Sequence, residues 1–187
     1  MHASVCDYVL DVVQNSVEAQ ARNVELDLFE EGGRISVRVA DDGRGMTEEE
    51  RSRALDPFRS SGGKHPGRRV GLGLPFLEQA VRAAEGEFSL ESRKNQGTTL
   101  RFSFPSGHLD TPPLGDVPGL FRSALAFDGA YELRIRRRRE ARAGAPGTEY
   151  EAARSELREA AGDLSCASAL ILVGRYLESL EYPGTDG

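Results

Sequence analysis

The chain has no tryptophan, only two cysteines and no long apolar segment. Two cysteines cannot form the disulfide framework of a small secreted domain, and neither Cys6 nor Cys166 lies in a CxxC or Cys/His pattern typical of a metal site. The longest apolar run, residues 167–174, is much shorter than the roughly 20 residues that cross a bilayer. The N-terminus carries Asp7 and Asp11 and lacks the basic start of a signal peptide. We therefore expect a protein of the reducing cytoplasm with no membrane segment.

An excess of positive charge is also absent, because 30 acidic residues outweigh 24 basic ones and the formal net charge is −6. Such a chain has no overall attraction to nucleic acids, so binding would need a local basic patch. The candidate is the arginine-rich segment 134–139, where a strand would place Arg134, Arg136 and Arg138 on one face. We favour a solvated or edge strand, kept from aggregating by its charge, over a nucleic-acid surface.

The remaining composition, 39% apolar and 29% charged over 187 residues, is that of an ordinary globular protein. Domains typically contain about 100 to 150 residues, so one core with a small appended unit fits this length. Segment 105–119 is rich in proline, glycine and aspartate, which indicates a boundary. We predict a first domain at residues 1–105 and a small α+β extension at residues 106–187.

Hydrophobic periodicity predicts the elements of both parts. The first part follows the order αββα, a loop, then αββ: a helix at 5–21, strands at 24–28 and 35–39, a short helix from the Thr47/Glu50 capping box to Ala54, a loop at 59–69, a helix at 73–85, and strands from 88 and at 99–104. The extension is predicted to have a helix at 117–127, a strand at 131–138, a loop at 142–147 and helices at 150–161 and 167–180.

The first predicted helix has one polar face. At about 100° per residue, Asp7, Asp11, Asn15 and Glu18 fall within a narrow stripe. An amide oxygen at position 15 can join the octahedral oxygen shell of a magnesium ion that otherwise holds phosphates and waters. The alternative for a single helical asparagine is simple solvation.

A second polar segment, Asp41-Asp42-Gly43-Arg44-Gly45-Met46, follows a predicted strand. A carboxylate at a strand end can accept a hydrogen bond from an adenine amino group, and Gly43 and Gly45 allow the backbone to approach a flat base. A surface turn between a strand and a helix would use the same residues.

The third segment, Gly71-Leu72-Gly73-Leu74, lies where a loop enters a helix. Backbone NH groups and the helix dipole can receive phosphate oxygens at such a position. An ordinary glycine-rich helix start is the alternative, since the segment is neither a P-loop nor a full dinucleotide motif.

Taken together, these segments resemble the histidine-kinase-like ATPase superfamily, which includes histidine kinases, DNA gyrase, Hsp90 and MutL. The resemblance covers residues 5–105 and rests on Asp11-x-x-x-Asn15, Asp41-x-Gly43-x-Gly45, Asp56-Pro57-Phe58, Gly71-x-Gly73-Leu74 and Gly97-Thr98-Thr99, which occur in the superfamily's order. It implies an α+β two-layer sandwich with a mixed, mostly antiparallel sheet and helices on one face. Segment 108–116 is in addition similar to small stand-alone bacterial ATP-binding proteins of the superfamily.

The resemblance also implies the ligands, ATP and Mg²⁺. Asn15 would chelate Mg²⁺, Asp41 would accept a hydrogen bond from adenine, and Thr98 would support the base directly or through water. Residues 59–70 correspond to the superfamily's ATP lid. The implied ATP-binding residues are Asn15, Asp41, Gly43, Gly45, Met46, Lys64, Arg68, Gly71, Leu72, Gly73, Leu74 and Thr98.

Position 11 bears on the reaction. In ATP-hydrolysing relatives an acid at this place, usually Glu, orients or deprotonates the attacking water. Asp11 has the same charge on a shorter side chain, so it is either a catalytic base or a partner of the Mg²⁺-bound waters. A further departure is Gln20, which stands where relatives often carry glycine and leaves the exact end of the first helix open.

The resemblance therefore implies an ATPase or a protein-directed phosphotransferase in regulation or signalling, similar to anti-sigma-factor kinases. A non-catalytic, ATP-dependent switch or partner-binding module is the alternative. We do not expect autophosphorylation, because none of His2, His65 and His108 lies on a predicted long helix beside an acid. A protein partner or phosphoacceptor is expected, and a homodimer is compatible with the sequence.

Overall fold

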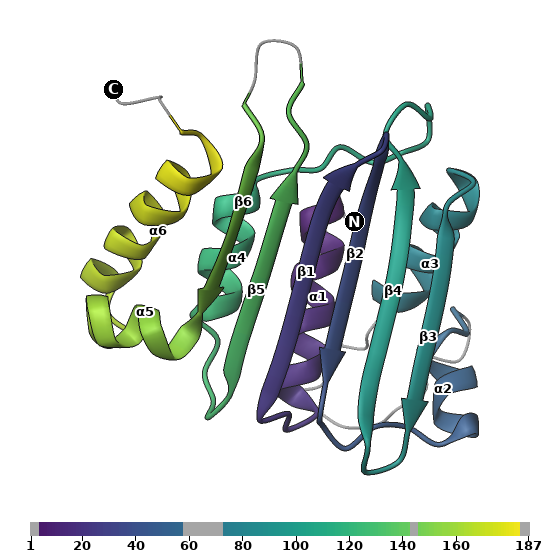
Figure 1. Ribbon diagram of the computed structural model, residues 1–187. Coiled ribbons are helices and arrows are strands. Elements are labelled where there is room, and N and C mark those ends of the chain that lie inside the picture. The colour runs from purple at the N-terminus through teal and green to yellow at the C-terminus, as the bar shows by residue number, and fades with distance from the viewer. Residues whose placement is uncertain (1–3, 58–72, 143–145, 184–187) are drawn as a thin grey trace.

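The computed structural model describes residues 4–57, 73–142 and 146–183. They form one mixed six-stranded sheet with the helices on one of its faces (Figure 1). The strands are β1 (Asn23–Glu31), β2 (Arg34–Asp41), β3 (Glu87–Arg93), β4 (Gly97–Pro105), β5 (Glu132–Arg139) and β6 (Thr148–Ala153). The helices are α1 (Val5–Glu18), α2 (Glu48–Ala54), α3 (Gly73–Ala83), α4 (Val117–Leu125), α5 (Arg154–Ala161) and α6 (Ala167–Glu181).

The strand order is β3-β4-β2-β1-β5-β6. All neighbours are antiparallel except β1 and β5, which run parallel. The predicted α+β fold class, a mostly antiparallel mixed sheet with helices on one face, is confirmed. Among the described helices none is long and apolar enough to span a membrane.

Local signals in the sequence account for the first elements. Gly32 and Gly33 have positive φ angles of 56° and 74°, so they close the β1–β2 hairpin where a side chain would be strained. Thr47 and Glu50 form the predicted capping box at the start of α2. Ser4 and Asp7 form a second one at the start of α1.

Helix α1 ends earlier than the apolar pattern predicts. The helix stops at Glu18 and not at residue 21, and Gln20 has a φ of 62°. This left-handed conformation favours glycine. Gln20 therefore occupies a strained backbone position directly after the helix.

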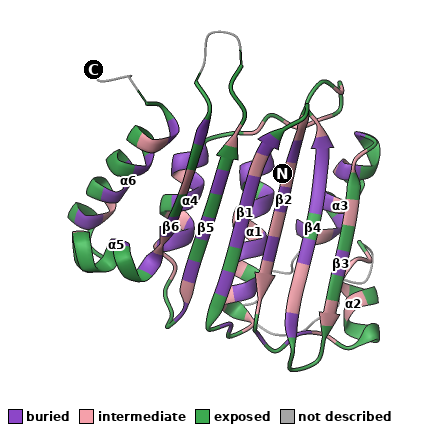
Figure 2. Cartoon of the chain, in the orientation of Figure 1, coloured by how far each residue is buried: buried purple, intermediate pink, exposed green. Residues whose placement is uncertain are grey.

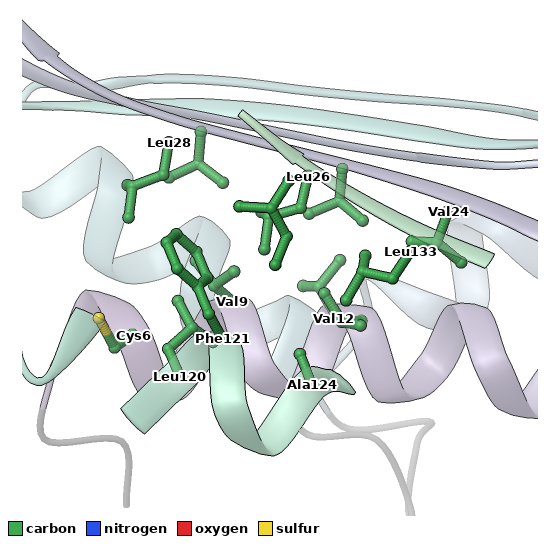
Figure 3. Close-up of a cluster of buried hydrophobic side chains, with 14 of the residues drawn as sticks. Cys6, Val9, Val12, Val24, Leu26, Leu28, Leu120, Phe121, Ala124 and Leu133 are labelled. Atoms are coloured by element: carbon green, nitrogen blue, oxygen red, sulfur yellow. The ribbon is translucent and has the colours of Figure 1, made fainter. Parts of the chain in front are cut away.

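The core lies between the sheet and the helices (Figure 2). Leu26 and Leu28 of β1 and Leu133 of β5 point toward Val9 of α1 and Phe121 of α4, as Figure 3 shows. All five side chains are fully buried. Helix α1 contacts both α3 and α4, so elements on both sides of residue 105 fix its position.

Two expectations for the segment after residue 105 are wrong. Residues 150–153 belong to strand β6, and the helix predicted at 150–161 begins only at Arg154. The arginine-rich strand β5 lies between β1 and β6, so it is not an edge strand, although Arg134, Arg136 and Arg138 are exposed on one face, as the solvated alternative predicted. Its Arg137 is fully buried against Glu30 and Glu181, which the sequence analysis did not anticipate.

The C-terminal segment continues the sheet of the first part, since β5 pairs with β1 along the whole strand from Asn23 to Glu30. Helix α4 likewise packs beside α1 in the helical layer. The predicted boundary at residue 105 therefore falls inside a continuous sheet, and the division into two domains stays a prediction.

Candidate functional site

The site is built around Asp41, the last residue of β2. Its Oδ2 accepts a hydrogen bond of 2.8 Å from the Ser16 hydroxyl, and its Oδ1 accepts one of 2.9 Å from the Gly43 amide. Ser16 is buried on α1. The half-buried carboxylate is thus held from two sides, which fixes the direction of its remaining lone pairs.

The loop after β2 approaches both α1 and the β3–β4 turn closely. The Arg44 amide donates to the Ala19 carbonyl over 3.0 Å, and a Cβ at Gly43 would lie 2.9 Å from the same oxygen. Gly45 has a φ of 55°, and a Cβ there would lie 1.9 Å from the Arg93 carbonyl oxygen. Glycine is therefore required at position 45 by both conformation and space.

The start of β4 completes this side of the site. Thr98 pairs with Asp41 across the β2–β4 ladder. Its hydroxyl lies 2.9 Å from that of Ser92, which also accepts a hydrogen bond from the Met46 amide. Gly97 has a φ of 89°, and a Cβ there would lie 1.8 Å from the Asp41 carbonyl oxygen. The Gly-Thr segment therefore packs directly on the strand end that carries the carboxylate.

Helix α1 connects this region to the start of α3. Asn15 is exposed and precedes Ser16, while Asp11 lies one turn earlier and is half-buried. A Cβ at Gly73 would lie 2.9 Å from Asp11 Oδ2, so the acid packs against the first residue of α3. Leu74 is half-buried and packs against the core.

Asp42, adjacent to the key carboxylate, has a structural role. It accepts hydrogen bonds from the amides of Arg22 and Asn23 and from the Asn23 side chain. Burial opposes ionisation, but these hydrogen bonds outweigh it and lower the pKa of Asp42. Asp42 thereby ties the end of β2 to the start of β1 and steadies its neighbour.

The structure thus brings together eight predicted site residues, from both glycine segments, α1 and β4: Asp11, Asn15, Asp41, Gly43, Gly45, Met46, Gly73 and Thr98. Leu74 lies at the border of this group. The predicted residues Lys64, Arg68, Gly71 and Leu72 lie outside the described residues.

Sequence reasoning missed Ser16 and Ser92, whose hydroxyls contact Asp41 and Thr98. The position of Ser16 held a usable signal, because it directly follows Asn15 and is a polar residue on the apolar side of the helix. Ser92 had no such signal, since its role depends on the pairing of β3 with β4.

The donor set fits an adenine nucleotide with a hard cation. A carboxylate has about four lone-pair positions. The described residues occupy two of those on Asp41, which leaves acceptor capacity for an amino group. Exposed Asn15 supplies the oxygen type that Mg²⁺ prefers. No cluster of three or more His, Cys, Asp and Glu side chains able to hold a metal occurs in the described part of the chain, so a cation here would depend on oxygens of the nucleotide.

The chain is similar to several known proteins. Residues 4–108 match the family described as histidine kinase-, DNA gyrase B-, and HSP90-like ATPase. The cell-division control histidine kinase PdhS of Brucella ovis (strain ATCC 25840 / 63/290 / NCTC 10512) is 31% identical over 115 residues, which are 54% of this chain and 11% of PdhS. PdhS of Brucella canis (strain ATCC 23365 / NCTC 10854 / RM-666) is 30% identical over 116 residues with the same coverage. The chain thus matches only about a ninth of the length of these curated relatives.

Among solved structures, the N-terminal domain of a DNA repair protein has a TM-score of 0.50 at 11% identity, covering 81% of this chain and 52% of that one. At this identity the likeness shows the fold alone, although it extends over more of the chain than the family match. More than half of the chain, with every described part of the site, lies within the family match. The chain belongs to the histidine kinase-, DNA gyrase B-, and HSP90-like ATPase family.

Proposed function

We propose that the protein binds Mg-ATP at the site around Asp41 and transfers the γ-phosphate to water or to a side chain of a partner protein. Family membership already gives the coarser statement, an ATP-binding, kinase-like domain. The observation that carries the proposal is the fixed orientation of the Asp41 carboxylate at the end of β2. Its hydrogen-bond donor, Ser16, directly follows Asn15 on α1.

In this proposal each residue has a defined task. Asp41 accepts a hydrogen bond from the adenine amino group, while Gly43, Gly45 and Thr98 line the place of the base. Asn15 would hold Mg²⁺, which neutralises phosphate charge when bound. The start of α3 at Gly73 faces the phosphates with its backbone amides.

Binding is tested by calorimetric titration of the purified protein with ATP, with and without Mg²⁺. We expect saturation, and we expect Asn15→Ala to remove most of the Mg²⁺-dependent gain in affinity. Gln14→Ala is the matched control, because this neighbouring amide bonds to Glu18 on the same helix. Absence of saturation at millimolar ATP in the folded protein would refute the proposal, and an unchanged Mg²⁺ dependence in Asn15→Ala would refute the role of Asn15.

The chemical step is tested by phosphate release and by transfer of labelled phosphate to co-purified proteins. If Asp11 is the base, Asp11→Asn should lower turnover by about 10²- to 10⁴-fold with little change in ATP affinity. Glu18→Gln, a carboxylate loss on an exposed turn of the same helix, should leave turnover unchanged. Turnover that survives Asp11→Asn would exclude Asp11 as the base.

A non-catalytic switch is the second candidate, and the position of Asp11 supports it. Its carboxylate packs on Gly73 at the start of α3, a placement suited to coupling nucleotide state to that helix. Hydrogen exchange in α3 should then differ between ATP, ADP and the nucleotide-free protein, without turnover. Equal protection of α3 in the three states would contradict the switch.

A further inference from the structure

Helix α6 is apolar on two sides. Its inner side buries Ala169, Val173, Gly174 and Leu177 against the rest of the molecule. Its outer face exposes Ile171 to 54%, Leu172 to 56% and Tyr176 to 47%, and Tyr182 just after the helix to 46%. In Figure 2 the exposed side of α6 lies at the edge of the molecule, beside α5.

Helix α6 carries large apolar side chains on its outer side as well as on its inner side. On the inner side Gly174 packs closely on α4, because a Cβ there would lie 3.2 Å from Cδ of Arg122. The larger side chains Ile171, Leu172 and Tyr176 point outward. Of the six large hydrophobic residues exposed in the described part of the chain, four belong to this face. Such a concentration indicates an interaction surface.

Two charges interrupt this face. At about 100° per residue, Ile171, Arg175 and Glu178 fall within about 60° of one another on the outer side of α6. The C-cap residue Tyr182 follows Glu178 by four residues, and the Arg139 guanidinium lies 5.9 Å from the centre of its half-exposed ring. Arg175 and Glu178 are exposed, and the described residues provide neither with an ion-pair partner. The stripe therefore runs apolar, positive, negative, apolar, with spacings of four, three and four residues.

This pattern is complementary to itself when reversed. In an antiparallel helix pair with a two-fold axis midway between Arg175 and Glu178, Arg175 comes level with Glu178 of the partner subunit, twice. Ile171 comes level with Tyr182 of the partner subunit, again twice. Both apolar ends are covered and both charges are paired by the same rotation, as an isologous interface requires.

We propose that the outer face of α6 is a homodimer surface, with the α6 helices of two copies packed antiparallel about this axis. Figure 1 places α6 at the opposite edge of the sheet from α2 and α3. Pairing there leaves both candidate nucleotide sites uncovered, so the proposal is independent of what those sites do.

Sedimentation velocity of the full chain over a range of concentrations tests the surface. We expect a dimer in the micromolar range, and we expect Ile171→Glu to weaken it by roughly a hundredfold, because it buries a charge in both halves of the interface. Leu109→Glu is the matched control: Leu109 is 96% exposed on the turn after β4, away from α6, and its loss should leave the dimer intact. Circular dichroism and ATP titration verify that each variant is folded.

Charge reversal tests the register. Arg175→Glu and Glu178→Arg should each weaken self-association by about tenfold, because each puts like charges opposite one another twice. An equimolar mixture of the two variants should associate as well as wild type, since every pair is then opposite in sign. The double variant Arg175→Glu/Glu178→Arg should also recover.

Three results would overturn the proposal. If the wild-type chain stays monomeric at roughly 100 µM, this face does not form a homodimer and would instead bind a different protein. A dimer unaffected by Ile171→Glu would place the interface elsewhere. Mixed charge variants that associate no better than each alone would exclude the antiparallel register.

Discussion

One of the two hydrogen bonds that orient the Asp41 carboxylate comes from a buried hydroxyl, that of Ser16. Ser16 donates to Oδ2 and is itself held on α1, the helix that carries Asn15. A change at Ser16 therefore acts on Asp41, the proposed acceptor for adenine, without replacing Asp41 itself. Substitution of Ser16 therefore tests the orientation of the Asp41 carboxylate while leaving its charge in place.

We predict that Ser16→Ala weakens ATP binding by about three- to tenfold, because a single hydrogen bond to a charged group contributes on the order of 1 kcal/mol. Calorimetric titration measures the change. Ser89→Ala, an exposed serine on β3, is the control and should bind ATP as wild type does. Wild-type affinity in Ser16→Ala would show that Gly43 alone holds the carboxylate.

Gln20 permits a second prediction at this scale. Its φ of 62° costs a side chain of this kind roughly 1 kcal/mol, which glycine avoids. Gln20→Gly should therefore raise the free energy of unfolding by up to about 1 kcal/mol in urea titrations, after the larger entropy of glycine in the unfolded chain is subtracted. Gln14→Gly, inside helix α1, should lower it by a similar amount. A loss of stability in Gln20→Gly would contradict the strain.

The sequence analysis selected those candidate site residues that carry a local pattern. Asp41, Gly43 and Gly45 share one short motif, and Asp11 and Asn15 share one helix face. Ser16 and Ser92 were missed because a hydroxyl finds its partner only after strands and helices from separate parts of the chain have packed. The Ser16 contact that holds Asp41 forms only when distant segments pack together, whereas the motif that points to Asp41 is local in the sequence.

At the scale of elements, β5 shows where charge misled the sequence analysis. Alternating arginines are typical of a solvated strand, yet Arg137 donates to Glu30 of β1 and to Glu181 of α6 in the interior. On the opposite face Arg136 binds Asp27 of β1 through two hydrogen bonds of 2.7 and 2.9 Å. Both partners are distant in sequence, so no local signal distinguishes these arginines from exposed ones.

At the β6–α5 junction, the sequence analysis predicted a helix where the structure has a strand. Residues 150–153 include Glu and Ala, which favour helices, and the sequence analysis assigned them to a helix. Pairing with β5 makes them a strand. Tertiary pairing overrides such weak intrinsic preferences.

Arg154, the first residue of α5, fastens this junction to α4. Its buried guanidinium donates to the carbonyls of Leu125, Phe127, Gly129 and Tyr131 and lies 4.2 Å from the centre of the Tyr131 ring. Leu125 is the last residue of α4, where helical acceptors lack partners, and the other three carbonyls belong to the connection between α4 and β5. One side chain thus caps α4 and positions α5.

We predict that Arg154→Met lowers the free energy of unfolding by about 2 to 4 kcal/mol, because buried carbonyls lose their donors. Arg158→Met, an exposed arginine on the same helix, should change it by less than about 0.5 kcal/mol. Urea denaturation followed by circular dichroism measures both. Equal effects of the two substitutions would contradict the capping role.

At the scale of the whole molecule, one continuous sheet contains strands from both predicted domains. Leu133 of β5 and Leu100 of β4 are both buried, on opposite sides of the central strands. We predict that Leu133→Ala and Leu100→Ala each cost about 2 to 5 kcal/mol and shift the same single unfolding transition. Bound nucleotide should raise the midpoint of that transition in both variants. Two separate transitions, with Leu133→Ala sparing the nucleotide-stabilised one, would support independent domains.

The parallel pairing of β1 with β5 has a consequence for biosynthesis. These strands lie side by side in the sheet but are about a hundred residues apart along the chain. Until the ribosome has synthesised β5, one hydrogen-bonding edge of β1 has no partner strand. Such an open edge is prone to pair with other nascent chains. Completion of the sheet is therefore a late event, so a chaperone that shields this edge during translation should raise the yield of soluble protein.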